Sequence, residues 1–168
     1  MTILFLNNYF PIFGGADSGA SNRSTMFISA LAELGNVDVV SFRKDEPVNI
    51  ANCNYVYNGE VACLAKEHRL DKFAKLFAFH SPNKIYPVTA EKERIIDEVV
   101  RAKKYDYIAC RYIREAVECG LLKYSSKLII DVDDNPRDVA LMAAKTARTL
   151  RNRLYNRIYA NTLDCMVK

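Results

Sequence analysis

At 168 residues, half of them apolar and 26% charged, the chain is long enough to bury a core, too apolar to be disordered and free of runs that could span a bilayer. Its net charge of +4 suits an anionic substrate or a membrane surface, but it is too small and dispersed to indicate nucleic-acid binding. Five cysteines without a Cys-x-x-Cys pair fit neither a zinc cluster nor a disulfide framework, and with no secretory signal in view they favour a reducing cytoplasm.

Six short apolar runs predict buried parallel strands, because strands covered on both faces read as continuous apolar stretches. The runs cover residues 2–6, 37–42, 55–57, 107–110, 128–132 and 163–167. The last run stops soon after it begins, and from this we expect a further domain beyond residue 168.

Helical patterns lie between most of these runs. In the first helix, which starts near Ala20, apolar side chains recur at the spacing of one buried face: Phe27, Ala30, Leu31 and Leu34. We expect Gly35 to end this helix in the left-handed conformation. A second helix is predicted over about 89–104, with an apolar stripe that consists of Ile95, Ile96, Val99 and Val100.

The alternation of strands and helices predicts an α/β fold: a Rossmann-like, doubly wound, mostly parallel sheet with helices on both faces, in a single domain. Right-handed crossovers place the ligand crevice of such a sheet at the carboxyl ends of its strands. Three loops leave those ends, at residues 7–19, 111–115 and 133–136. We expect these loops to meet in space.

The first of these loops contains an adjacent glycine pair, Gly14 and Gly15, which lets the main chain approach a ligand without a Cβ atom in the way. Arg23 follows in the first turns of the next helix, which Ser18 or Ser21 could cap. The spacing matches neither a P-loop nor the dinucleotide fingerprint. The loop therefore indicates a phosphate or diphosphate site, and the alternative is a loop that binds nothing.

Three carboxylates follow the strand at 128–132: Asp131, Asp133 and Asp134. Because like charges this close repel, we expect them to bind a hydroxyl-rich ligand, a cation or a basic partner, or to be well solvated. Asp134 or Asn135 could instead cap the next helix, with Pro136 at its first position.

Arg111 follows the strand at 107–110 and points, on this prediction, into the same crevice. It could pair with a carboxylate or phosphate of a ligand, or form a salt bridge to Asp133 or Asp134. The two histidines, His68 and His80, follow no strand end, so we expect surface or packing roles for them.

Two stretches combine basic and apolar residues. Residues 137–157 hold six basic residues and one acid, with leucines and an isoleucine nearby, a pattern that can rest on anionic lipid. A solvated outer face or a contact with an acidic partner are the alternatives. Residues 64–79 predict either a core helix or a lip that meets a membrane or an apolar acceptor.

Taken together, the chain resembles the N-terminal domain of a two-domain glycosyltransferase of the GT-B type, in the large retaining group that includes sucrose synthases and bacterial mannosyltransferases. The resemblance covers essentially the whole chain. It rests on the strand at 3–6, Gly14-Gly15, residues 21–23, the helix that ends at 31–35 and the strand at 37–42. A subset of the group has an Asp-x-Asp-Asp stretch before a basic helix, which is similar to residues 131–134 followed by 137–157.

The resemblance implies that residues 1–168 form the acceptor-side domain, while a C-terminal domain outside this chain holds most of a nucleotide diphosphate-sugar. The implied activity is sugar transfer to a growing glycan or a lipid-linked acceptor, with no cofactor and usually no metal. The fragment alone would be inactive. Peripheral membrane contact through the basic helices is a separate expectation, which rests on the basic and apolar residues themselves. The residues facing the substrates would be Gly14, Gly15 and Arg23 for the donor phosphates, and Arg111, Asp133 and Asp134 for acceptor hydroxyls.

Two other functions stay open. The stretch from Asp131 also resembles the nucleophile motif of haloacid-dehalogenase phosphatases, although Asn135 stands where that motif has Thr or Val and the motif lies far from the N-terminus. The other alternative is a non-catalytic module that binds a nucleotide or sugar in the same crevice.

Overall fold

The computed structural model describes residues 1–9, 12, 19–45, 49–61, 86–132 and 135–163. The chain divides into two units. The first combines residues 1–63 and 88–131, and the second combines 64–87 and 132–168.

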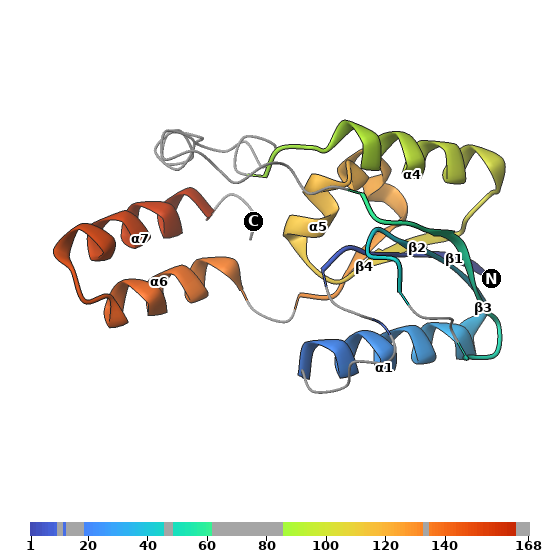
Figure 1. Ribbon diagram of the computed structural model, residues 1–168, viewed down its shortest axis with the longest axis horizontal. Helices are drawn as coiled ribbons and strands as arrows, with labels where there is room; N and C mark the ends of the chain where they lie inside the picture. Colours follow the sequence, from blue (N-terminus) through green and yellow to red (C-terminus); the bar gives the residue numbers. More distant parts are fainter. Residues whose placement is uncertain (10–11, 13–18, 46–48, 62–85, 133–134, 164–168) are drawn as a thin grey trace. The chain divides into compact units, whose positions relative to one another are not determined.

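The first unit contains a five-stranded, all-parallel sheet in the order β3-β2-β1-β4-β5, which is a Rossmann-like α/β fold (Figure 1). The strands are β1 (Thr2–Asn7), β2 (Asn36–Ser41), β3 (Cys53–Asn58), β4 (Tyr107–Cys110) and β5 (Leu128–Ile130). The fold class predicted from the alternation of apolar runs and helices is confirmed. Five of the six predicted strands are present, with ends shifted by at most two residues.

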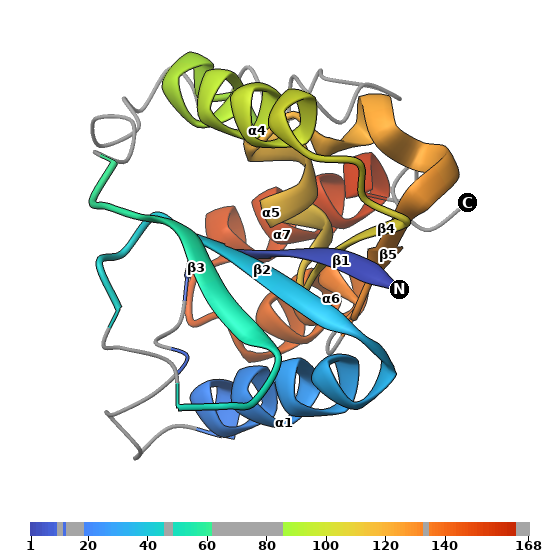
Figure 2. The ribbon, with the colours of Figure 1, turned by 90° about the vertical axis from the view of Figure 1, so that its right-hand side faces the viewer.

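Helices cover both faces of this sheet (Figure 2). On one face lies α1 (Gly19–Leu34), and on the other lie α4 (Ala90–Ala102), α5 (Ile113–Glu118) and the 3-10 helix η1 (Leu121–Lys127). Both ends of α4 lie within two residues of the predicted ones, and its predicted apolar stripe packs in the core.

Alternate residues of β1 supply the two halves of the core, because successive side chains of a strand point to opposite faces. Ile3 and Phe5 pack with Ile28 of α1, whereas Leu4 and Leu6 pack with Ile96 of α4. All six are buried. β1 is the central strand of the sheet, and five of its six residues are buried. Packing on both faces therefore holds its carboxyl end in place.

Two details of α1 differ from the prediction. Ala30 and Leu34 are exposed, and the buried face contains Ser21 and Ser24 instead. Gly35 does not adopt the left-handed conformation. Glycine is needed at position 35 for a steric reason, because a Cβ atom there would clash with the carbonyl oxygen of Met1. The same oxygen accepts a hydrogen bond from the backbone N–H of Asn36.

The second unit contains a helical hairpin of α6 (Pro136–Thr146) and α7 (Leu150–Leu163), which pack against each other. The single basic helix suggested by residues 137–157 is therefore two helices, separated at 147–149. The strand predicted at 163–167 is wrong at its start, because Leu163 ends α7, and the remainder lies outside the described residues.

The start of α6 agrees with the prediction. The Asn135 side chain accepts a hydrogen bond from the backbone N–H of Arg137 at 3.0 Å, and Pro136 occupies the first turn. Proline fits there because its missing N–H would have no partner inside the helix. Within the described part of the chain, no helix has the length and apolar character needed to cross a membrane.

Candidate functional site

The candidate site lies at the carboxyl ends of β1, β4 and β5. The chain leaves β1 toward β2 on one side, whereas β4 pairs on the other side, so the strand order reverses beside β1. In open parallel sheets, ligands bind outside the carboxyl ends of the strands at such a switch point. Asn8 follows β1 at this position, Arg111 follows β4, and Asp131 follows β5.

Asp131 connects two arginines at this edge. Its carboxylate accepts hydrogen bonds from Arg23 Nη2 at 2.8 Å and Arg23 Nε at 3.1 Å, and from Arg111 Nε at 3.3 Å. The hydrogen bonds and charge of Arg23, followed by the charge of Arg111, hold the pKa of Asp131 below its usual range. A carboxylate between two guanidinium groups leaves the cluster with a net positive charge.

The two arginines differ in exposure. The Arg111 side chain is 3% exposed, donates to Ser24 Oγ at 3.0 Å and lies 4.9 Å from the centre of the Tyr112 ring. The Arg23 side chain is 45% exposed. Arg111 is therefore held in place under the cluster together with Asp131. Arg23 is the member of the cluster that a ligand can reach.

A hollow of about 480 Å³ opens beside Arg23. It is lined by Gly19, Asn22, Arg23, Met26, Phe27 and Asp131. Gly19 and Asn22 belong to the first turn of α1, which carries no acidic residue. The dipole and the N–H groups of a helix N-terminus attract anions, and the first turn of α1 shares this hollow with a guanidinium group. The chemistry of this hollow suits a phosphate or diphosphate.

Buried charged groups lie close to this edge of the sheet. Lys92 of α4 is buried and donates from Nζ to Asn8 Oδ1 at 2.8 Å. Glu115 of α5 is also buried and accepts the backbone N–H of Arg111 at 3.1 Å. Burial raises the pKa of Glu115 to about 8, although backbone hydrogen bonds and the charges of Arg111 and Lys92 act in the opposite direction. The Nδ2 group of Asn8 is buried and has no hydrogen-bond partner among the described residues.

The segment after β1 is held by a second contact. The Tyr9 hydroxyl donates to Glu118, which also accepts from Arg114 Nε at 2.6 Å. The Arg114 guanidinium lies over the Tyr9 ring at 5.1 Å. Burial, together with the neighbouring Glu118 carboxylate, raises the pKa of Tyr9. This hydroxyl is therefore a hydrogen-bond donor at any physiological pH.

The structure brings together Arg23 and Arg111, which the sequence had assigned to one crevice. Arg111 forms an ion pair with Asp131, which we had not named as its partner; the alternative of a salt bridge to Asp133 or Asp134 is not tested. Both of those aspartates lie outside the described residues, as does the Gly14-Gly15 pair. The contacts of these residues with substrate, and that of Arg111 with an acceptor, stay predictions. His68, His80 and the stretch 64–79 also lie outside the described residues.

Lys92 and Glu115 are the functional candidates that sequence reasoning missed. Lys92 precedes Ile95, Ile96 and Val99 at helical spacing, so it is a charged residue on an apolar stripe. That position was a usable signal, because a lysine on a buried face needs a polar partner. Glu115 gave no comparable signal.

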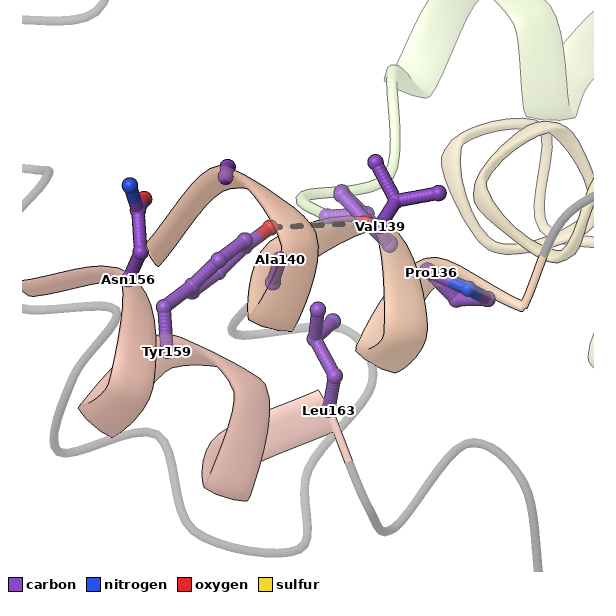
Figure 3. A pocket seen from close by; sticks show the side chains of 8 residues that line it. Pro136, Val139, Ala140, Asn156, Tyr159 and Leu163 are labelled. Atoms are coloured by element: carbon purple, nitrogen blue, oxygen red, sulfur yellow. Dashed lines mark hydrogen bonds between the residues drawn. The ribbon is translucent and has the colours of Figure 1, made fainter. Parts of the chain in front are cut away.

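The second unit has a hollow of its own, of about 360 Å³, between α6 and α7. Figure 3 shows Tyr159 and Leu163 of α7 on one side of it and Val139 and Ala140 of α6 on the other. The Tyr159 hydroxyl lies 3.4 Å from that of Tyr86. Its described lining holds no charged side chain, so it is the weaker candidate for an anionic ligand.

Comparisons with protein-family models, with curated proteins and with solved structures give no match for this chain. The residues and their geometry therefore carry the functional argument.

Proposed function

We propose that this chain is the N-terminal, Rossmann-like half of a glycosyltransferase that moves a sugar from a nucleotide diphosphate-sugar to a glycan or lipid-linked acceptor. The observation that carries the proposal is the hollow that the first turn of α1 shares with Arg23, beside the switch point of the sheet. A diphosphate leaving group needs cationic and N–H donors, and both are present there.

The reaction explains why such donors matter. As the glycosidic bond of the donor breaks, negative charge grows on the leaving nucleoside diphosphate. Groups that bind this charge more tightly in the transition state than in the ground state lower the barrier. Arg23 is oriented for this role by Asp131, which holds its guanidinium through two hydrogen bonds. The Gly14-Gly15 backbone would supply further N–H groups, as the resemblance implies.

The acceptor would lie against the same edge of the sheet. Arg111 positions Asp131 through a hydrogen bond from its Nε atom. Asp133 and Asp134 follow shortly after in the sequence and are the candidate partners for acceptor hydroxyls. Carboxylates suit this role because each accepts several hydrogen bonds from neighbouring hydroxyl groups.

Release of nucleoside diphosphate from a panel of nucleotide sugars, measured with the whole protein that carries this chain, tests the proposal. Replacing Arg23 by glutamine should lower kcat/KM for the donor by roughly tenfold to a hundredfold, because one charged donor to the leaving group is lost. Arg23→Lys keeps the charge but loses the planar fork, so it should recover only part of the rate.

Arg94→Gln is the matched control. Arg94 lies on α4, is exposed and pairs with Glu98 four residues along the helix, so its loss should leave donor turnover unchanged. Failure of every nucleotide sugar to release its diphosphate in the presence of glycan and lipid acceptors contradicts the proposal. Turnover that is insensitive to Arg23→Gln removes this hollow from the mechanism.

The phosphatase alternative has less support from the geometry. A nucleophilic carboxylate needs an oxygen free to attack phosphorus, whereas both oxygens of Asp131 accept hydrogen bonds from arginines. Magnesium-dependent hydrolysis of p-nitrophenyl phosphate that is lost in Asp131→Asn would nevertheless favour it. Nucleotide-sugar binding without turnover would favour the binding module.

A further inference from the structure

We propose that the outer face of α7 is a docking surface for an anionic lipid layer. We call this surface the α7 ridge and define it by Leu150, Leu154 and Ile158, with Arg151, Arg153 and Arg157 beside them. It belongs to the second unit and does not depend on the proposed function.

The apolar part of the α7 ridge is exposed. Leu150 is 82% exposed and Leu154 is 59% exposed, and Ile158 continues the row at the same four-residue spacing. At 3.6 residues per turn, these three side chains fall within about 80° of the helix circumference. One exposed leucine is ordinary on a protein surface, but an aligned row is typical of a contact surface.

The opposite side of α7 already has its partner. Ala160 and Leu163 are buried, and Tyr159 and Leu163 are directed toward α6 (Figure 3). The α7 ridge is therefore a second apolar face of the same helix. A helix of this length that presents a second apolar face alongside basic residues suits an interface between water and lipid.

Arginines flank the apolar row on both sides. Helical geometry places Arg153 and Arg157 on one side of it and Arg151 on the other, and all three are exposed. The basic character extends beyond the ridge, because residues 145–163 contain five basic residues and no acidic one. Among the described residues, no carboxylate forms an ion pair with Arg148, Arg151 or Arg157.

This combination selects an anionic membrane over other acidic partners. A nucleic acid or an acidic protein surface would satisfy the arginines but leave the leucine row in water. A lipid layer offers negative headgroups at the level of the arginines and an acyl region just below, into which the leucines can insert. The charge of the ridge further favours the anionic lipids of a cytoplasmic leaflet over neutral ones.

A tryptophan probe tests the contact directly, because the chain contains no tryptophan. In Leu154→Trp, the single indole stands on the α7 ridge. Its emission should shift to the blue on addition of vesicles that contain phosphatidylglycerol, and brominated acyl chains should quench it. The control is Leu34→Trp, at the exposed end of α1, where the original leucine is 64% exposed. Its emission should not change.

Co-sedimentation of the whole chain with the same vesicles separates the contribution of the arginine charges to binding from that of the inserted leucines. Removing the charges of Arg151, Arg153 and Arg157 with glutamine should weaken binding roughly fivefold for each change, since one basic residue near an anionic surface contributes about 1 kcal/mol. Leu150→Asn with Leu154→Asn should weaken it about tenfold or more, because inserted apolar surface is lost. Arg101→Gln, at an exposed side chain of α4 in the other unit, is the control for charge.

Binding to phosphatidylglycerol vesicles, little binding to pure phosphatidylcholine and a decrease with added salt support the proposal. Binding that survives both sets of substitutions overturns it, as does an unchanged Leu154→Trp spectrum in a protein whose circular dichroism is intact. Sensitivity to the arginine changes alone, with equal binding to polyglutamate, also overturns it, because an acidic polymer would then be the better description of the partner.

Discussion

At the scale of single residues, the candidate site depends on ionisable groups that are held out of water. Arg111 and Glu115 are both buried near the carboxyl end of β4, and Lys92 is buried on α4. Buried charges are tolerated only where partners satisfy them, so each fixes the position of another group. Arg111 fixes Asp131, Lys92 fixes the Asn8 side chain, and Glu115 fixes the backbone that follows β1 and β4.

Glu115 makes the stability of the fold depend on pH. Its folded pKa of about 8 lies above the ordinary value of 4.5, so between these values the unfolded chain holds fewer protons than the folded one. The free energy of unfolding should therefore fall as pH rises through this window, by up to about 1.4 kcal/mol for each pH unit. Glu115→Gln, which cannot ionise, should remove this component. Urea unfolding across the window measures it.

The control for this prediction is Glu98→Gln, an exposed residue of α4 paired with Arg94. It should leave the pH dependence close to that of the unsubstituted chain, because surface ion pairs contribute little to stability. Equal slopes for the Glu115→Gln variant and the unsubstituted chain would show that Glu115 ionises in the folded protein as it does in the unfolded one.

At the scale of elements, the cap of α6 can be tested in isolation. Asn135→Ala removes the side-chain oxygen that accepts the Arg137 N–H and should cost about 0.5–2 kcal/mol of helix stability. Asn135→Asp keeps an acceptor and adds a favourable charge at the helix N-terminus, so it should retain the stability. Hydrogen exchange of the α6 amides reads out both variants. Equal exchange in the alanine and aspartate variants is the result that would contradict the assigned cap.

Elements with one dominant signal were predictable from the sequence. β1 and β4 were found because burial on both faces makes them continuously apolar. The start of α6 was found because Asn is a favoured N-cap residue and Pro is favoured at the first helical position. The buried face of α1 was predicted in part, because Phe27 and Leu31 pack in the core whereas Ala30 and Leu34 are exposed, and the difference has a physical reason. Ser24 is buried to accept a hydrogen bond from Arg111, so a polar residue replaces the expected apolar one.

The part of the candidate site that was predictable consists of residues that come directly after the strands or the first loop. Arg23 and Arg111 were assigned to one crevice because the carboxyl ends of parallel strands share an edge. The pairing of both with Asp131 was not predictable, because the sequence offers three carboxylates within four positions and does not say which of them an arginine meets. Glu115 was missed because its burial comes from packing between α5 and the sheet, which leaves no periodic pattern in so short a helix.

At the scale of the whole molecule, the described residues of the two units differ in the apolar side chains that they bury. The sheet unit buries large side chains in two clusters, with Phe5 and Ile28 on one face and Leu6 and Ile96 on the other. In α6 and α7, most of the buried side chains are alanines. Since burial stabilises in proportion to apolar area, the helices of the second unit should open at a lower free energy than the strands.

Hydrogen exchange of the unsubstituted chain should therefore be slowest in β1, which is paired on both sides and central in the sheet, and faster in α6 and α7. Phe5→Leu should increase exchange throughout β1, β2 and β4 together, because the side chain is fully buried and packs with residues of all these strands.

Hydrogen exchange in the presence of phosphatidylglycerol vesicles also tests the α7 ridge. Exchange in α7 should slow while that of β1 stays unchanged, because lipid binding to a marginally stable helix restricts its opening. Protection of α7 equal to that of β1 without lipid would show that the buried alanines stabilise the hairpin far more than their area allows.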